Sequence, residues 1–161
     1  MIVAHYIGPA KPGIAARIGW AAIRLGQKGP YDDCTHTEAV HQVHADGTFT
    51  IASSSIADRG VRVKRTTLTP GHWVLTDVPA WDVARSVAWF AQAQAAGVRY
   101  DRRGAAATLL PGKQDDDKVF CTEAVLSPYV LAAHYYTPAL GLALCLSLGI
   151  DVTARLLPSA H

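Results

Sequence analysis

The sequence predicts an α+β fold, in which helices flank a central antiparallel sheet. Strand-like segments gather between residues 35 and 78, whereas segments with helical periodicity lie before and after them. The dipeptide Asp46-Gly47 separates two β-like runs, a pattern typical of a tight hairpin between antiparallel strands. The chain has 161 residues and no internal repeat, so we expect residues 1–161 to form a single domain.

The N-terminal segments predict one strand and one helix. Residues 2–7 are β-like and stop at Gly8-Pro9. Residues 14–25 carry apolar side chains at helical spacing, and residues 26–33 form a loop rich in Gly, Pro and Asp.

The middle of the chain predicts four strands. Residues 35–44 and 48–52 are the two arms of the hairpin. Residues 61–65 and 72–78 are two further candidates, with the same enrichment in β-forming residues.

The C-terminal half is predicted to be mainly helical. Residues 81–96 form a helix with Asp82 near its start and Gly97 at its end, whose expected apolar face comprises Val83, Val87 and Phe90. Residues 100–118 are irregular and include the run Asp115–Asp117, interpreted as a solvated loop.

Two more helices are predicted after this loop. Residues 121–136 read as a helix that Pro128 kinks or splits. Residues 137–148 form the last helix, with Pro138 in its first turn.

Composition excludes several classes of protein. Half of the residues are hydrophobic and 17% are charged, which excludes intrinsic disorder. A net charge of +2 is too balanced for a protein that binds nucleic acid, and the sequence lacks the glycine-rich motifs that cradle nucleotide phosphates. The longest apolar stretch, 138–150, is too short to span a bilayer. With no signal peptide in evidence, a cytoplasmic location is expected.

The three cysteines do not predict a disulfide framework. Cys34, Cys121 and Cys145 cannot all pair, and none lies in a CxxC motif. A reducing compartment is therefore expected, with no metal and no cofactor.

Cys121 is the strongest candidate for a catalytic residue. The apolar pair Val119-Phe120 leads directly into it, and it begins the helix predicted over 121–136. Backbone N–H groups at a helix N-terminus stabilise a thiolate, which is the nucleophilic form of cysteine. Cys145 lies within an apolar helix and is interpreted as core, whereas Cys34 precedes the first hairpin strand and is the weaker alternative.

A cysteine nucleophile needs a base, and His36 is the best candidate. On a strand, His36 and Glu38 are two residues apart and share a face, so the carboxylate can orient the imidazole and favour its protonated form. By the same alternation, His36 and His44 share a face but lie far apart, which disfavours a three-histidine metal site on this strand.

These residues resemble the papain-like NlpC-type cysteine hydrolases. The segment Gly97–Gly104, followed by Val119–Glu123, is similar to the G-x-x-Y-[DN]-x-x-G and F-C-[ST]-E motifs of that superfamily. The candidate histidine precedes the cysteine, an order that resembles the circularly permuted branch of amidases and lecithin:retinol acyltransferase-like enzymes. The resemblance covers about residues 30–130, and it is to small members of the family found in phages and bacteria.

The resemblance leaves the third catalytic residue open. Several permuted relatives place an acidic residue on the strand after the hairpin, but residues 50–55 contain no carboxylate. The orienting group is therefore Glu38, or a serine such as Ser53 or Ser54, or the site is a Cys–His dyad.

The resemblance implies a cysteine hydrolase or acyltransferase with Cys121 as nucleophile, His36 as base and Glu38 as the favoured third residue. Its substrate would be a peptide, lipid or protein acyl group, attacked through an acyl-enzyme. The main alternative is a non-catalytic binding module with the same fold that acts on a host protein or a lipid. A zinc hydrolase that uses His36, Cys121 and an acid is a third, less favoured reading.

Overall fold

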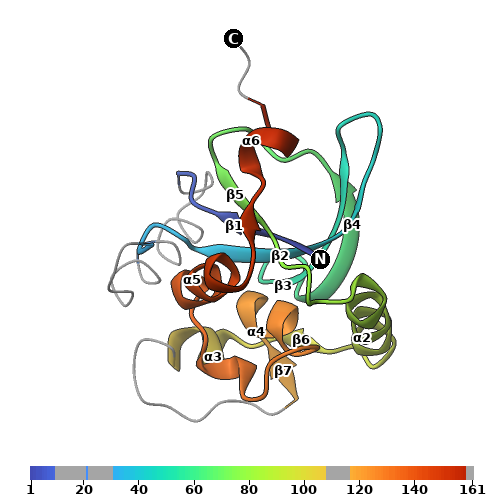
Figure 1. Ribbon diagram of the computed structural model, residues 1–161. Helices are drawn as coiled ribbons and strands as arrows, with labels where there is room; N and C mark the ends of the chain where they lie inside the picture. The colour runs from blue at the N-terminus through green and yellow to red at the C-terminus, as the bar shows by residue number, and fades with distance from the viewer. Residues whose placement is uncertain (10–20, 22–30, 108–116, 159–161) are drawn as a thin grey trace.

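The strands form one curled, mixed sheet in the computed structural model, which describes residues 1–9, 21, 31–107 and 117–158 (Figure 1). Their order across the sheet is β7-β6-β4-β3-β2-β1-β5-β8. Neighbouring strands are antiparallel except for β6 and β7, which are parallel. The strands are β1 (Ile2–Tyr6), β2 (His36–Val43), β3 (Phe49–Ser55), β4 (Gly60–Thr66), β5 (Trp73–Asp77), β6 (Arg99–Tyr100), β7 (Lys118–Val119) and β8 (Ile150–Asp151).

The predicted hairpin is confirmed, with one irregularity. Strands β2 and β3 pair antiparallel across the turn, where Gly47 adopts a positive φ of 77°. Between Val40 and Gln42 the register shifts by one residue, so His41 is the extra residue of a β-bulge. The bulge reverses the alternation of side chains beyond it, so the expectation that His36 and His44 share a face is wrong.

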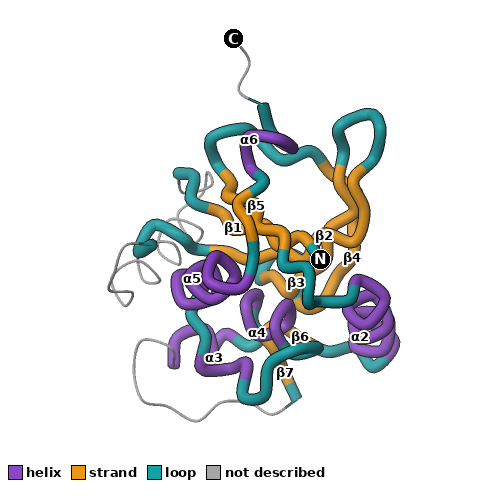
Figure 2. Tube along the Cα trace, in the orientation of Figure 1, coloured by secondary structure: helices purple, strands orange, loops and turns teal. Residues whose placement is uncertain are grey.

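The two faces of the sheet carry two separate apolar clusters. Val3, Ala39 and Ala52 belong to one cluster together with residues of the helices α2 (Val83–Ala95), α4 (Cys121–Leu126) and α5 (Pro138–Leu148). Ala4 and Ile51 are adjacent in sequence to Val3 and Ala52, and they belong to the other cluster. This cluster includes residues beside α6 (Thr153–Leu156). Figures 1 and 2 show α6 near the top of the view, apart from α2, α4 and α5.

Helix α2 begins and ends where the sequence predicts. The Asp82 carboxylate accepts a hydrogen bond of 2.9 Å from the Ala84 N–H, and Gly97 beyond the helix has a φ of 65°. The predicted apolar face is partly wrong, because Val87 is 44% exposed. The buried residues of the helix are Ser86, Phe90 and Ala93.

The helix predicted over 121–136 is two elements. α4 ends at Leu126, and a 3₁₀ helix follows at Ala133–Tyr135. Pro128 lacks an N–H and cannot continue the helical hydrogen bonds, which explains why the chain splits here.

Other short elements differ from the prediction. The segment 100–118, expected to be irregular, includes α3 (Arg102–Ala107) as well as parts of β6 and β7. β8 and α6 were not predicted, because two and four residues are too few for a periodic pattern. The predicted helix over 14–25 lies outside the described residues except for residue 21, as do residues 26–30 of the predicted loop and residues 115–116 of the Asp run; residues 31–33 of the loop form a turn.

α5 matches its predicted bounds. The Thr137 hydroxyl caps it by accepting a hydrogen bond of 3.1 Å from the Leu140 N–H, and Pro138 occupies the first turn. The helix has 11 residues, and no helix within the described ranges is long and apolar enough to cross a membrane.

Cys145 is a fully buried member of the cluster beneath the helices, as its sequence context predicts. We expect Cys145→Ser to lower the free energy of unfolding by about 1–3 kcal/mol, because the substitution places a hydroxyl in an apolar site. Chemical denaturation measures this difference. Ser147→Ala on the exposed side of the same helix is the control, and equal destabilisation by the two variants would contradict the assignment of Cys145 to the core.

Candidate active site

Cys121 is the first residue of α4, as predicted, and it is 3% exposed. Phe120 before it is extended, and its N–H donates to the Glu123 carboxylate at 3.3 Å, which fixes the start of the helix. α4 packs on β2 and β3, so the helix that carries Cys121 lies against the strand that carries His36. The candidate nucleophile and the candidate base therefore come from two elements that pack against each other.

The Cys121 thiol and the His36 imidazole lie close enough to shift each other's pKa values. His36 is the first residue of β2, and its side chain is 22% exposed. Its Nε2 lies 2.9 Å from Oε1 of Glu38. Since Nε2 is occupied by the carboxylate, Nδ1 is the nitrogen that remains for the thiol.

The pKa of the Cys121 thiol is lowered, and the pKa of the His36 imidazole is raised. Burial raises the pKa of Cys121, but the positive charge of His36 and hydrogen bonds from His36, the Thr37 backbone and Thr122 lower it below its ordinary value. Burial lowers the pKa of His36, but the negative charges of Cys121 and Glu38 raise it to about 9. The arrangement therefore favours a thiolate paired with an imidazolium.

Glu38 is a buried carboxylate with two cationic partners. It is 2% exposed, and besides His36 it accepts two hydrogen bonds from the guanidinium of Arg62. Burial raises the pKa of Glu38, but the charge of His36 and the hydrogen bonds from Arg62 and His36 lower it to about 2. Glu38 is therefore ionised and acts only as an acceptor.

Ser53 and Ser54, the alternatives to Glu38, form no hydrogen bond with His36 among the described residues. The Ser53 hydroxyl donates to the Thr37 carbonyl at 2.7 Å. Within the described part of the chain, the buried Ser54 hydroxyl has no hydrogen-bond partner. The geometry therefore favours Glu38 as the group that orients the imidazole.

A neutral polar network lies beside the pair. The hydroxyl of Thr37 is 3.1 Å from that of Thr122 and 3.4 Å from Nδ1 of His5. Burial lowers the pKa of His5 to about 3, so this second imidazole carries no charge near neutral pH. His5 is therefore unsuited to act as the base, although it too is a buried histidine close to α4.

Arg62 contacts Glu38, and sequence reasoning did not place it at the site. It is 9% exposed and belongs to β4, with β3 between it and Glu38. A signal exists in the sequence, because an arginine within a strand needs an acidic partner when it is buried. Which carboxylate it meets depends on the register of three strands.

The other two cysteines lack the features that activate a thiol. Burial raises the pKa of Cys145 to about 12, and burial together with the charge of Cys121 raises that of Cys34 well above its ordinary value. The Cys34 thiol lies 3.4 Å from the Pro138 carbonyl. Cys34 is thus in the neighbourhood of the site but is not poised as a nucleophile.

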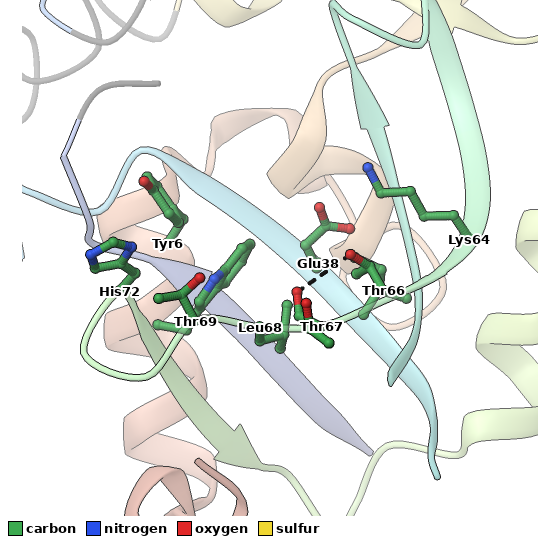
Figure 3. A pocket seen from close by; sticks show the side chains of 10 residues that line it. Tyr6, Glu38, Lys64, Thr66, Thr67, Leu68, Thr69 and His72 are labelled. Atoms are coloured by element: carbon green, nitrogen blue, oxygen red, sulfur yellow. Dashed lines mark hydrogen bonds between the residues drawn. The ribbon is translucent and has the colours of Figure 1, made fainter. Parts of the chain in front are cut away.

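A cavity of about 190 Å³ adjoins Glu38 (Figure 3). Tyr6, Lys64 and His72 line it together with Glu38, and Ile51, Leu68 and Trp73 add apolar surface. Neither Cys121 nor His36 lines it, so the cavity lies beside the carboxylate rather than over the nucleophile. In the described ranges, no three His, Cys, Asp or Glu side chains are grouped so that they could hold a metal ion.

We expect iodoacetamide to alkylate Cys121 well below pH 7 and much faster than Cys34 or Cys145, because only its pKa is lowered. Labelling across a pH series, read by peptide mass spectrometry, measures this selectivity. An onset of labelling near pH 9, or label mainly on Cys34 at pH 6, would contradict the thiolate–imidazolium pair.

We expect Glu38→Gln to lower the pKa of His36 by about one unit or more, because the neutral amide no longer stabilises the imidazolium while the positive charge of Arg62 remains nearby. NMR titration of the His36 ring measures the change. Glu123→Gln is a matched control, since Glu123 caps α4 without contacting His36. An unchanged pKa in Glu38→Gln would show that Glu38 does not support the base.

Comparison of the chain with protein-family models, with curated proteins and with solved structures found no match. The resemblance to papain-like hydrolases therefore rests on the short motifs in the sequence. The function is argued below from those motifs and from the geometry of Cys121, His36 and Glu38.

Proposed function

We propose that this protein is a cysteine hydrolase or acyltransferase that acts on an amide or ester through an acyl-enzyme. The observation that carries the proposal is the meeting of three side chains. The helix that begins at Cys121 packs on the strand where His36 lies 2.9 Å from Glu38, and the thiol pKa is lowered while the imidazole pKa is raised. A buried cysteine without a function behaves as a small apolar residue with a raised pKa, as Cys145 does.

In the first half of the proposed reaction, the Cys121 thiolate attacks the carbonyl carbon of the substrate and forms a C–S bond. Electrons move onto the carbonyl oxygen, and in this proposal backbone N–H groups at the start of α4 stabilise that oxyanion. The tetrahedral intermediate collapses when the C–N or C–O bond breaks. The His36 imidazolium gives its proton to the leaving nitrogen or oxygen.

In the second half, neutral His36 removes a proton from water or from another acceptor, which attacks the thioester carbonyl. The C–S bond breaks, the acyl group leaves on the acceptor, and the thiolate–imidazolium pair is restored. Glu38 keeps the ring oriented throughout by accepting from Nε2, which is the main task of the third residue in such sites.

Two features support a permuted papain-like arrangement. The base lies on β2 and precedes the nucleophile in the chain, and the nucleophile begins a helix that packs on that strand.

All three cysteines are free, which suits a reducing compartment such as the cytoplasm. The acyl donor is proposed as a peptide, a protein amide or a lipid ester.

Reaction with p-nitrophenyl acetate tests the proposal without knowledge of the natural substrate. We expect a burst of p-nitrophenol and, after acid quenching, a mass gain of one acetyl group on Cys121. Cys121→Ser should reduce the burst by roughly a hundredfold or more, because the nucleophile is lost.

Cys34→Ser, checked by its thermal melt, is the control and should retain the burst. A wild-type protein that is fully folded but forms no acyl-enzyme would contradict the proposal and favour the binding module. Retention of the burst in Cys121→Ser would place the nucleophile elsewhere.

A further inference from the structure

We propose that Arg62 is a positioning residue for the Cys121–His36 pair, because its guanidinium holds Glu38 against His36 and balances the charge of the buried reactive form. The inference rests on the proposed function in one respect, namely that the thiolate of Cys121 is the reactive species. It adds a residue on a strand that carries none of the three proposed catalytic groups.

The contact between Glu38 and Arg62 crosses an intervening strand. Ser53 of β3 pairs with Arg62 of β4, and continuing the β2–β3 register by one residue from Ala39 and Ala52 places Ser53 opposite Glu38. Directly opposed residues share a face, so Glu38, Ser53 and Arg62 form one row. Ser53 is small, and the two long side chains meet over it in a bidentate ion pair.

The guanidinium is also held from its other side. Arg62 Nε donates to Asp58 at 3.0 Å, and Asp58 accepts a hydrogen bond of 2.6 Å from the hydroxyl of Ser55. All three nitrogens of Arg62 therefore bond to carboxylates. This arrangement fixes the plane of the guanidinium and, through the bidentate pair, the plane of the Glu38 carboxylate that faces His36.

Charge balance is the second part of the argument. The reactive form holds a thiolate, an imidazolium and a carboxylate, which together carry one net negative charge in a buried site. Arg62 brings this sum to zero. Without it, the buried negative charge would favour protonation of Glu38 or Cys121, since burial penalises an uncompensated charge.

Other titratable and charged groups surround these residues. Glu38 faces His36 along its own strand and Arg62 from β4, and Arg62 faces Asp58 from the turn before β4. The groups that line the cavity with Glu38 or influence Cys121 from other elements are Tyr6, Cys34, Lys64, His72 and Tyr100. Within the described residues, His36 and Arg62 are the two cationic groups in contact with Glu38.

The experiment measures the rate of Cys121 alkylation by iodoacetamide against pH in Arg62→Met. We expect the acid limb of the profile to move upward by roughly one pH unit, because removing a positive charge raises the pKa of nearby acids. Arg65→Met is the matched control: Arg65 lies on the same strand and pairs with Asp46 at the exposed hairpin tip. Its acid limb should match that of the wild type.

Arg62→Lys separates charge from geometry and serves also if Arg62→Met does not fold. Lysine retains the charge but cannot form the bidentate fork. We expect its acid limb to stay near that of the wild type, while the acyl-enzyme burst rate falls several-fold. A shifted acid limb in Arg62→Lys would overturn the charge argument, and a wild-type burst rate would overturn the positioning argument.

Two failures are distinguishable in these data. If wild-type Cys121 is alkylated only near pH 9, the proposed function fails regardless of Arg62. If the wild-type limb is low and folded Arg62→Met shows the same limb, the proposed function stands and the inference about Arg62 is wrong.

Discussion

The burial of one carboxylate, that of Glu38, constrains the arrangement of the whole site. An ionised carboxylate at 2% exposure is stable only when cations and hydrogen-bond donors surround it. Here the donors come from the same strand, through His36, and from two strands away, through Arg62. The sheet must therefore hold three strands in one register, with a small residue on the middle strand, before the imidazole can be oriented toward Cys121.

The site is a series of alternating charges that runs from the helix to the hairpin turn between β3 and β4. In the proposed reactive form, the charges of Cys121, His36, Glu38, Arg62 and Asp58 alternate in sign. The contacts join His36 to Glu38, Glu38 to Arg62 and Arg62 to Asp58. Burial strengthens such interactions because the local dielectric is low. Cys121 and Glu38 are the least exposed members of the series, whereas the Asp58 side chain is 37% exposed.

Local patterns in the sequence predicted the local parts of the site. The apolar pair before Cys121 predicted the helix start, and the two-residue spacing of His36 and Glu38 predicted their shared face. Arg62 could not be assigned in the same way, because its partner depends on strand register and the bulge at His41 changes that register by one residue. Without the bulge, the register that pairs Gln42 with Thr50 would have placed Ser54 opposite Glu38, and Arg62 on the other face. The exposure of Val87 likewise reflects tertiary packing that periodicity alone does not contain.

The bulge at His41 divides β2 into two parts that differ in their tolerance to changes of length. Between the bulge and the hairpin tip, the chain is exposed and an extra residue can be accommodated in the turn. The pairing is regular from His36 to Val40, so one residue inserted between His36 and Glu38 would turn them to opposite faces. Insertions and deletions in this hairpin are therefore confined to its tip wherever the site is retained, and the tip is the natural place to attach a tag or a fluorophore.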